Sequence, residues 1–96
     1  MPMTVIVTRD VPTRTRGFLE SICPEPAPGV YTAANMSKGV RERVWSVVSD
    51  WYGAIGEGSI VMVWRDDNAA GGLGLATLGT PPRKLADLDG VLVSVW

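Results

Sequence analysis

The stretch that decides the fold is MTVIVTRDVPTRTRGFLESIC, residues 3–23. Residues 3–8 are rich in β-branched side chains, which predicts a short, largely buried strand. Pro12 suits the first position of a helix, because its fixed φ fits the helix and its missing N–H is not needed there. Apolar residues then recur on one face up to about Cys23. The chain therefore opens with a strand that leads directly into an amphipathic helix.

The rest of the chain continues this alternation. Ser37 is a suitable N-cap for a longer helix that ends near Ile55. Further strands are expected at residues 29–33, 60–65, 74–78 and 91–96, with loop or turn at 81–84 and 87–90. This order predicts a ferredoxin-like α+β sandwich, β-α-β-α-β-β with an extra C-terminal strand. Residues 1–80 would form this domain, and residues 81–96 a loop and strand for docking.

Arg14 and Arg16 fall in the first turns of the first predicted helix. They face the positive end of the helix dipole, where acidic residues are normally favoured. Unpaired N–H groups and guanidinium groups together form a site for phosphate, which would relieve the repulsion. The alternative is that both side chains simply extend into solvent, where the electrostatic penalty is small. The pair is therefore a candidate phosphate site.

Length and composition limit the classes of protein to consider. A chain of 96 residues forms one domain with one modest core. It has no run of about 18 uncharged apolar residues, so we expect no membrane span, and its start does not resemble a signal peptide. The single cysteine, Cys23, cannot form an internal disulfide and is expected to be a small buried hydrophobic residue. These features favour the cytoplasm.

The charges are unevenly distributed, although the net charge is only −1. Residues 1–43 carry six basic and four acidic side chains, whereas residues 44–96 carry three basic and six acidic ones. This segregation permits one basic face on an acidic body.

The chain contains no histidine, which removes the commonest general base and all histidine metal sites. Carboxylates remain for metal binding, and they would favour Mg²⁺ or Mn²⁺. Asp10 is the best placed, because it lies between the first strand and the first helix. One carboxylate is a weak Mg²⁺ site unless a dimer axis or substrate phosphates complete it. The other close acidic pairs, Asp66 with Asp67 and Asp87 with Asp89, are expected to form turns rather than metal sites.

The last predicted strand is apolar on both faces. A strand of this kind at a free edge invites pairing with another chain. We therefore expect an obligate oligomer, in which a second copy or a different protein covers this strand. The residues that would dock the partner are Val91, Leu92, Val93, Val95 and Trp96.

Several motifs follow one another along the chain. They are MxVIVTxxVPxRxRG at 3–17, PGVY at 28–31, SKxxRE at 37–42 with Trp45, IVMVW at 60–64, GxxxRK at 79–84 and DLDG at 87–90. Each motif alone is weak, but their shared order and near-matching spacing are specific. Together they resemble CRISPR-associated protein 2 of subtype I-E systems over essentially the whole chain.

This resemblance implies a ferredoxin-like homodimer that is the central scaffold of the CRISPR adaptation complex, which acquires spacers. Dimers of the integrase, CRISPR-associated protein 1, would flank it and perform the cutting and joining. The small dimer would support the middle of the double-stranded prespacer DNA through phosphate contacts, and its C-terminal segment would dock the integrase. The residues that match the DNA-contacting positions are Arg14, Arg16, Lys38, Arg83 and Lys84.

The chain departs from the family pattern at the end of the first strand. Many members carry an acidic residue there, credited with metal-dependent nuclease activity, whereas Arg9 takes the matching position here and Asp10 follows it. An arginine in place of a metal ligand would repel Mg²⁺, which favours a non-catalytic chain that requires no cofactor. Two alternatives stay open. One is a Mg²⁺-dependent endonuclease of RNA or DNA with Asp10 at the dimer interface, and the other is an interaction protein that binds a small ligand or a regulatory partner.

Overall fold

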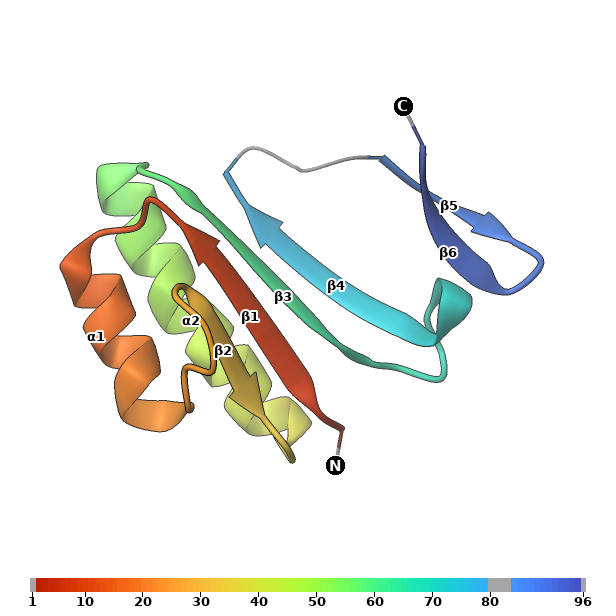
Figure 1. Cartoon of the computed structure of the whole chain (residues 1–96), viewed down its shortest axis with the longest axis horizontal. Coiled ribbons are helices and arrows are strands. Elements are labelled where there is room, and N and C mark those ends of the chain that lie inside the picture. The colour runs from red at the N-terminus through yellow and green to blue at the C-terminus, as the bar shows by residue number, and fades with distance from the viewer. Residues whose placement is uncertain (1, 80–83, 96) are drawn as a thin grey trace.

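The computed structural model describes residues 2–79 and 84–95. It contains two helices beside a sheet, and a separate hairpin near the C-terminus (Figure 1). The helices are α1 (Thr13–Ile22) and α2 (Lys38–Ile55), with a short 3-10 turn η1 (Ala70–Gly72). The strands are β1 (Thr4–Arg9), β2 (Val30–Ala33), β3 (Ser59–Arg65), β4 (Leu73–Leu78), β5 (Lys84–Leu88) and β6 (Val91–Val95).

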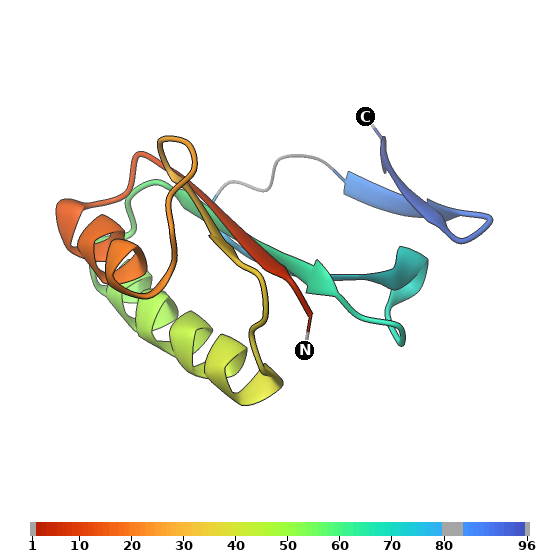
Figure 2. The same cartoon turned by 60° about the horizontal axis from the view of Figure 1, so that its bottom comes forward.

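Four strands form the main sheet in the order β2-β1-β3-β4, and each neighbouring pair is antiparallel. Both helices pack on the same face of this sheet (Figure 2). At the centre, Ile6 of β1 lies opposite Tyr31 of β2 and Met62 of β3. This two-layer arrangement is consistent with a ferredoxin-like fold, so the predicted fold class is confirmed.

The main sheet has one buried face and one face that the helices leave uncovered, because successive side chains of a strand point to opposite sides. The helix-facing side chains form the core with residues of α1 and α2. The largest fully buried ones are Tyr31, Ile6, Leu19, Ile60, Met62 and Val48. On the opposite face Val7, Leu73 and Leu75 are exposed. The expectation that the first strand is largely buried is therefore right for one face only, because a β-branched run does not distinguish burial on one face from burial on both.

The limits of α2 agree with the prediction. The Ser37 hydroxyl accepts a hydrogen bond of 3.2 Å from the N–H of Val40, which makes Ser37 the N-cap. The helix ends at Gly56, whose φ of 72° is left-handed and whose N–H donates to the Tyr52 carbonyl at 2.6 Å. Cys23 is buried, as expected, and burial raises the pKa of its thiol.

The C-terminal segment holds one strand more than the sequence predicts. Residues 84–88 form β5, which pairs antiparallel with β6 around the two-residue turn Asp89-Gly90. Both turn residues have positive φ, and the Asp87 carboxylate accepts a hydrogen bond of 2.9 Å from the Gly90 N–H. An Asp-Gly turn of this kind joins two paired strands. The sequence predicts the turn correctly, but it does not predict the strand that leads into it.

Neither α1 nor α2 is long and apolar enough to cross a membrane.

Candidate nucleic-acid interface

Arg14 and Arg16 lie in the first turns of α1, which begins after the cap residue Pro12. Consecutive helical residues are about 100° apart around the axis, so residues separated by two point to nearly opposite sides. The contacts agree with this geometry, because Arg14 lies against Trp51 of α2 and Arg16 against Glu25 in the loop before β2. The structure thus separates two side chains that the sequence presents as one pair.

Arg14 lies over an aromatic ring. Its guanidinium carbon lies 4.1 Å from the centre of the Trp51 ring, a cation–π geometry. Phe18, one turn further along α1, packs edge-on against the same ring, with centroids 5.4 Å apart and an interplanar angle of 78°. Arg14 is exposed, and no carboxylate among the described residues forms a salt bridge with it. Its charge is therefore both fixed in place and open to an anion from solution.

Arg16 already has an anionic neighbour within the chain. Its Nη2 lies 3.6 Å from Oε2 of Glu25, and the same Oε2 accepts a hydrogen bond of 2.8 Å from the Gly29 N–H. The Gly29 carbonyl in turn accepts hydrogen bonds from the N–H and the hydroxyl of Thr8 at the end of β1. Glu25 is thus anchored to the backbone of a loop that is itself fastened to the sheet.

Tyr31 lies beneath this ion pair and is fully buried. Its hydroxyl approaches both Arg16 and Glu25, but it completes no hydrogen bond of good geometry with the described residues. Its proximity is the main reason that the pKa of Arg16 is raised above its usual value, with Glu25 adding to the effect. The hydrogen bond from Gly29 is the main reason that the pKa of Glu25 is lowered. Burial raises the pKa of Tyr31 itself.

Asp10 lies just beyond β1 in the left-handed region, with φ of 56°. It borders a small pocket of about 230 Å³ whose other lining residues are Thr8, Val11, Arg16, Pro28 and Gly29. Within the described part of the chain, no three His, Cys, Asp or Glu side chains lie close enough together to hold a metal ion. A single carboxylate that shares its pocket with a guanidinium does not fit Mg²⁺ within one chain.

The remaining predicted DNA contacts lie elsewhere. Lys38 is the exposed first residue of α2 and lies 13 positions before Trp51, roughly 20 Å along the helix axis. Lys84 begins β5, in the hairpin that stands apart from the main sheet in Figure 1. Arg83 lies outside the described residues. Within the described part of the chain, neither Lys38 nor β5 therefore lies beside Arg14.

The predicted docking strand is β6, and within the described residues it pairs with β5. Leu88 and Val91 face each other across this hairpin and are each 61% exposed. Leu92 packs against η1, so closely that a Cβ at Gly71 would overlap it. Of the other docking residues, Val93 is half-buried and Val95 ends the strand. Trp96 lies outside the described residues.

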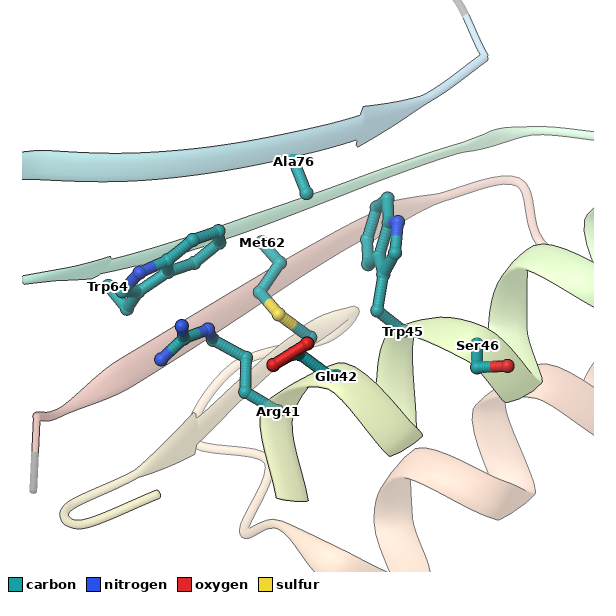
Figure 3. Close-up of a pocket in the computed structure, with 7 residues that line it drawn as sticks. All are labelled: Arg41, Glu42, Trp45, Ser46, Met62, Trp64 and Ala76. Carbon is teal, nitrogen blue, oxygen red and sulfur yellow. The ribbon is translucent and has the colours of Figure 1, made fainter. Parts of the chain in front are cut away.

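Sequence reasoning missed the second role of the tryptophans. The spacing of apolar residues places Trp51 in the core stripe of α2, yet its ring also supports Arg14, a contact between distant segments that no local pattern predicts. Arg41 lies over Trp64 in the same way, 4.2 Å from the ring centre. Trp64, Trp45 and Met62 line a pocket of about 440 Å³ between α2 and the sheet, with Arg41 and Glu42 at its side (Figure 3). Trp45 is also packed against the core.

The chain is thus a small α+β protein whose first helix carries two arginines, Arg14 and Arg16, near its N-terminus. Residues 3–93 match the family of CRISPR-associated proteins designated Cas_Cas2CT1978. Because the match spans nearly the whole chain, the protein belongs to this family and is of the Cas2 type.

Proposed function

We propose that this chain is a non-catalytic scaffold subunit of the CRISPR adaptation complex, which binds the backbone of the duplex prespacer and bridges integrase dimers. The family supports a role in a CRISPR system. The observation that carries the DNA-binding part is the exposed Arg14 guanidinium, held on Trp51 without a salt-bridge partner among the described side chains. A fixed, unpaired guanidinium at a helix N-terminus suits a phosphate oxygen.

Two apolar surfaces support an assembly of more than one chain. The first is the face of the main sheet that the helices leave uncovered, where Val7, Leu73 and Leu75 are exposed. The second is the C-terminal hairpin, with Leu88 and Val91 at its turn. Isolated two-stranded hairpins are marginally stable in water, so this one gains from a partner. In our proposal the sheet face forms the homodimer and β6 docks the integrase, CRISPR-associated protein 1.

The competing function is a Mg²⁺-dependent endonuclease. In this chain Asp10 shares its pocket with Arg16 and not with further carboxylates of the described residues, which favours phosphate binding over metal binding. A scaffold that contacts only phosphates binds duplexes of different sequence equally well, and its affinity falls steeply with salt.

The test is duplex binding by Arg14→Ala, with Arg65→Ala as the matched control. Arg65 is also an exposed arginine, but it lies at the far end of β3 and pairs with Asp67 at 3.2 Å. Fluorescence anisotropy with a labelled duplex across a salt series should show weaker binding for R14A. The slope of log K against log salt should be shallower by about 0.9 for each phosphate that the variant no longer neutralises. R65A should bind like the wild type. Equal slopes for all three proteins would contradict the phosphate assignment.

A further inference from the structure

The two arginines of α1 differ in what holds them. Arg14 rests on an uncharged ring, whereas Arg16 rests on a carboxylate that carries the same sign of charge as a DNA phosphate. A phosphate that approaches Arg16 therefore competes with Glu25 for the same guanidinium. No such competitor faces Arg14 among the described residues.

Glu25 is the fixed member of its ion pair. It stands between Pro24 and Pro26, whose rings restrict the loop. Its Oε2 atom is held at 2.8 Å by the Gly29 N–H, and Gly29 is itself hydrogen-bonded to Thr8 of β1. The side chain is only 22% exposed. These contacts hold the carboxylate in place whether or not Arg16 is beside it.

Arg16 is the movable member. Its side chain is 47% exposed, and its distance of 3.6 Å to Glu25 is longer than a close charge-assisted hydrogen bond. A partly exposed ion pair at this separation contributes modestly to stability, so a phosphate can draw the guanidinium away from it. A phosphate that recruits Arg16 therefore has to draw the guanidinium away from this fixed carboxylate.

We propose that Glu25 determines how strongly Arg16 engages the DNA backbone, because it occupies the guanidinium in the free protein and competes with phosphate for it. The inference rests on the proposed DNA-binding function and adds a negative determinant to it. Arg14 can then contact a phosphate without leaving a carboxylate partner. Arg16 contacts a phosphate only when the DNA backbone competes successfully with Glu25. Glu25 is a positioning residue, because it acts through Arg16 and not on DNA directly.

The experiment compares Glu25→Gln with Glu20→Gln in the full-length chain, using a labelled duplex as the probe. Gln keeps a carbonyl oxygen for the Gly29 N–H and removes only the charge. Glu20 lies one turn beyond Arg16 on α1 and also raises its pKa, but only Glu25 forms a salt bridge with Arg16 among the described residues. At low salt E25Q should bind about two- to fivefold more tightly than the wild type, and E20Q should gain less than about twofold.

The gain must depend on Arg16. In an Arg16→Ala background, E25Q should bind no more tightly than R16A alone, because the partner that the charge restrains is gone. An equal gain with and without Arg16 would overturn the proposal, since it would reflect a general reduction of negative charge. The absence of any gain when Arg16 is present would overturn it as well.

Two further comparisons apply if E25Q does not fold or if the protein does not bind DNA. If E25Q does not fold, R16A and R14A are compared in the otherwise natural chain. R16A should then weaken duplex binding less than R14A does. An equal or larger effect of R16A would overturn the proposal. If R14A weakens duplex binding but E25Q changes nothing, the inference fails while the DNA-binding function stands. If neither the wild type nor E25Q binds duplex, the proposed DNA-binding function is wrong, and this inference, which depends on it, is wrong as well.

Discussion

Trp64 of β3 lies directly over Gly74, its register partner on β4, so closely that a Cβ at position 74 would overlap the indole ring. Gly74 is buried and its φ is not in the left-handed region, so the restriction is one of space. The glycine leaves room for the indole, and the Arg41 guanidinium carbon lies 4.2 Å from the centre of the same ring system. A glycine within a strand, the second residue of β4, is thus explained by a side chain on the neighbouring strand.

Gly74→Ala should destabilise the fold by about 1–3 kcal/mol, because the indole must shift within a packed layer. Urea unfolding followed by circular dichroism measures the change. Gly53→Ala is the control, since it lies in α2 with no atom within 4 Å of the added methyl group, and it should stabilise the helix by roughly 0.5–1 kcal/mol. A G74A protein as stable as the wild type would contradict the close packing of Trp64.

The Arg14–Trp51 contact predicts that charge alone is not sufficient at position 14. Arg14→Lys keeps the charge but lacks the flat guanidinium that stacks on the ring, so its duplex affinity should fall between those of the wild type and Arg14→Ala. Trp51→Leu should also weaken binding, because it removes the ring that orients Arg14. Anisotropy titrations at two salt concentrations measure both, and wild-type affinity for R14K would show that the ring contact does not matter for DNA.

Asp10→Asn tests the nuclease alternative. Asparagine tolerates the left-handed backbone at this position, so the variant should fold normally. For a scaffold we expect purified wild-type protein and D10N to behave alike with labelled RNA or DNA in Mg²⁺, with no cleavage that depends on residue 10. Cleavage by the wild type that is abolished in D10N would establish the enzymatic function instead.

Glu25 predicts a difference in acid stability. The Gly29 N–H holds the pKa of Glu25 below its usual value, so the folded state favours the ionised form. The resulting stabilisation is complete above the unfolded-state pKa, about 4.3, and is lost as the pH falls through the lower folded-state value. Glu25→Gln should therefore melt at a lower temperature than the wild type at pH 6, and the difference should shrink below about pH 4.3. A constant difference in melting temperature from about pH 6 to about pH 3 would contradict the assignment.

The proposed assembly assigns integrase docking to the C-terminal hairpin. A double variant, Leu88→Lys with Val91→Glu, places opposite charges at two exposed positions that face each other and should leave the fold intact. It should abolish co-purification with the integrase, while light scattering still reports a homodimer. Disruption of the dimer together with normal integrase binding would reverse the assignment of the two apolar surfaces.

The sequence predicts most of the fold because the signals are local. Ser37 caps the start of α2 by accepting a hydrogen bond from the Val40 N–H, and Gly56 ends the helix in a left-handed conformation that glycine adopts easily. The strand β5 was missed because residues 84–88 contain no clear alternation, and only their pairing with β6 defines them as a strand. The relation between Arg14 and Arg16 could not be predicted fully, because the helix fixes their directions but not their neighbours. Trp51 comes from a segment that is distant in sequence, and Glu25 stands between two prolines in the loop after α1.

The opposite directions of Arg14 and Arg16 constrain how any rod-shaped polyanion can sit on α1. A ligand that touches both guanidinium groups cannot run alongside the helix, because one side of the helix would then be out of reach. Such a ligand has to cross the N-terminal end of α1 roughly at a right angle to the helix axis. If both arginines contact DNA as proposed, two side chains only two residues apart restrict the angle between the duplex and α1.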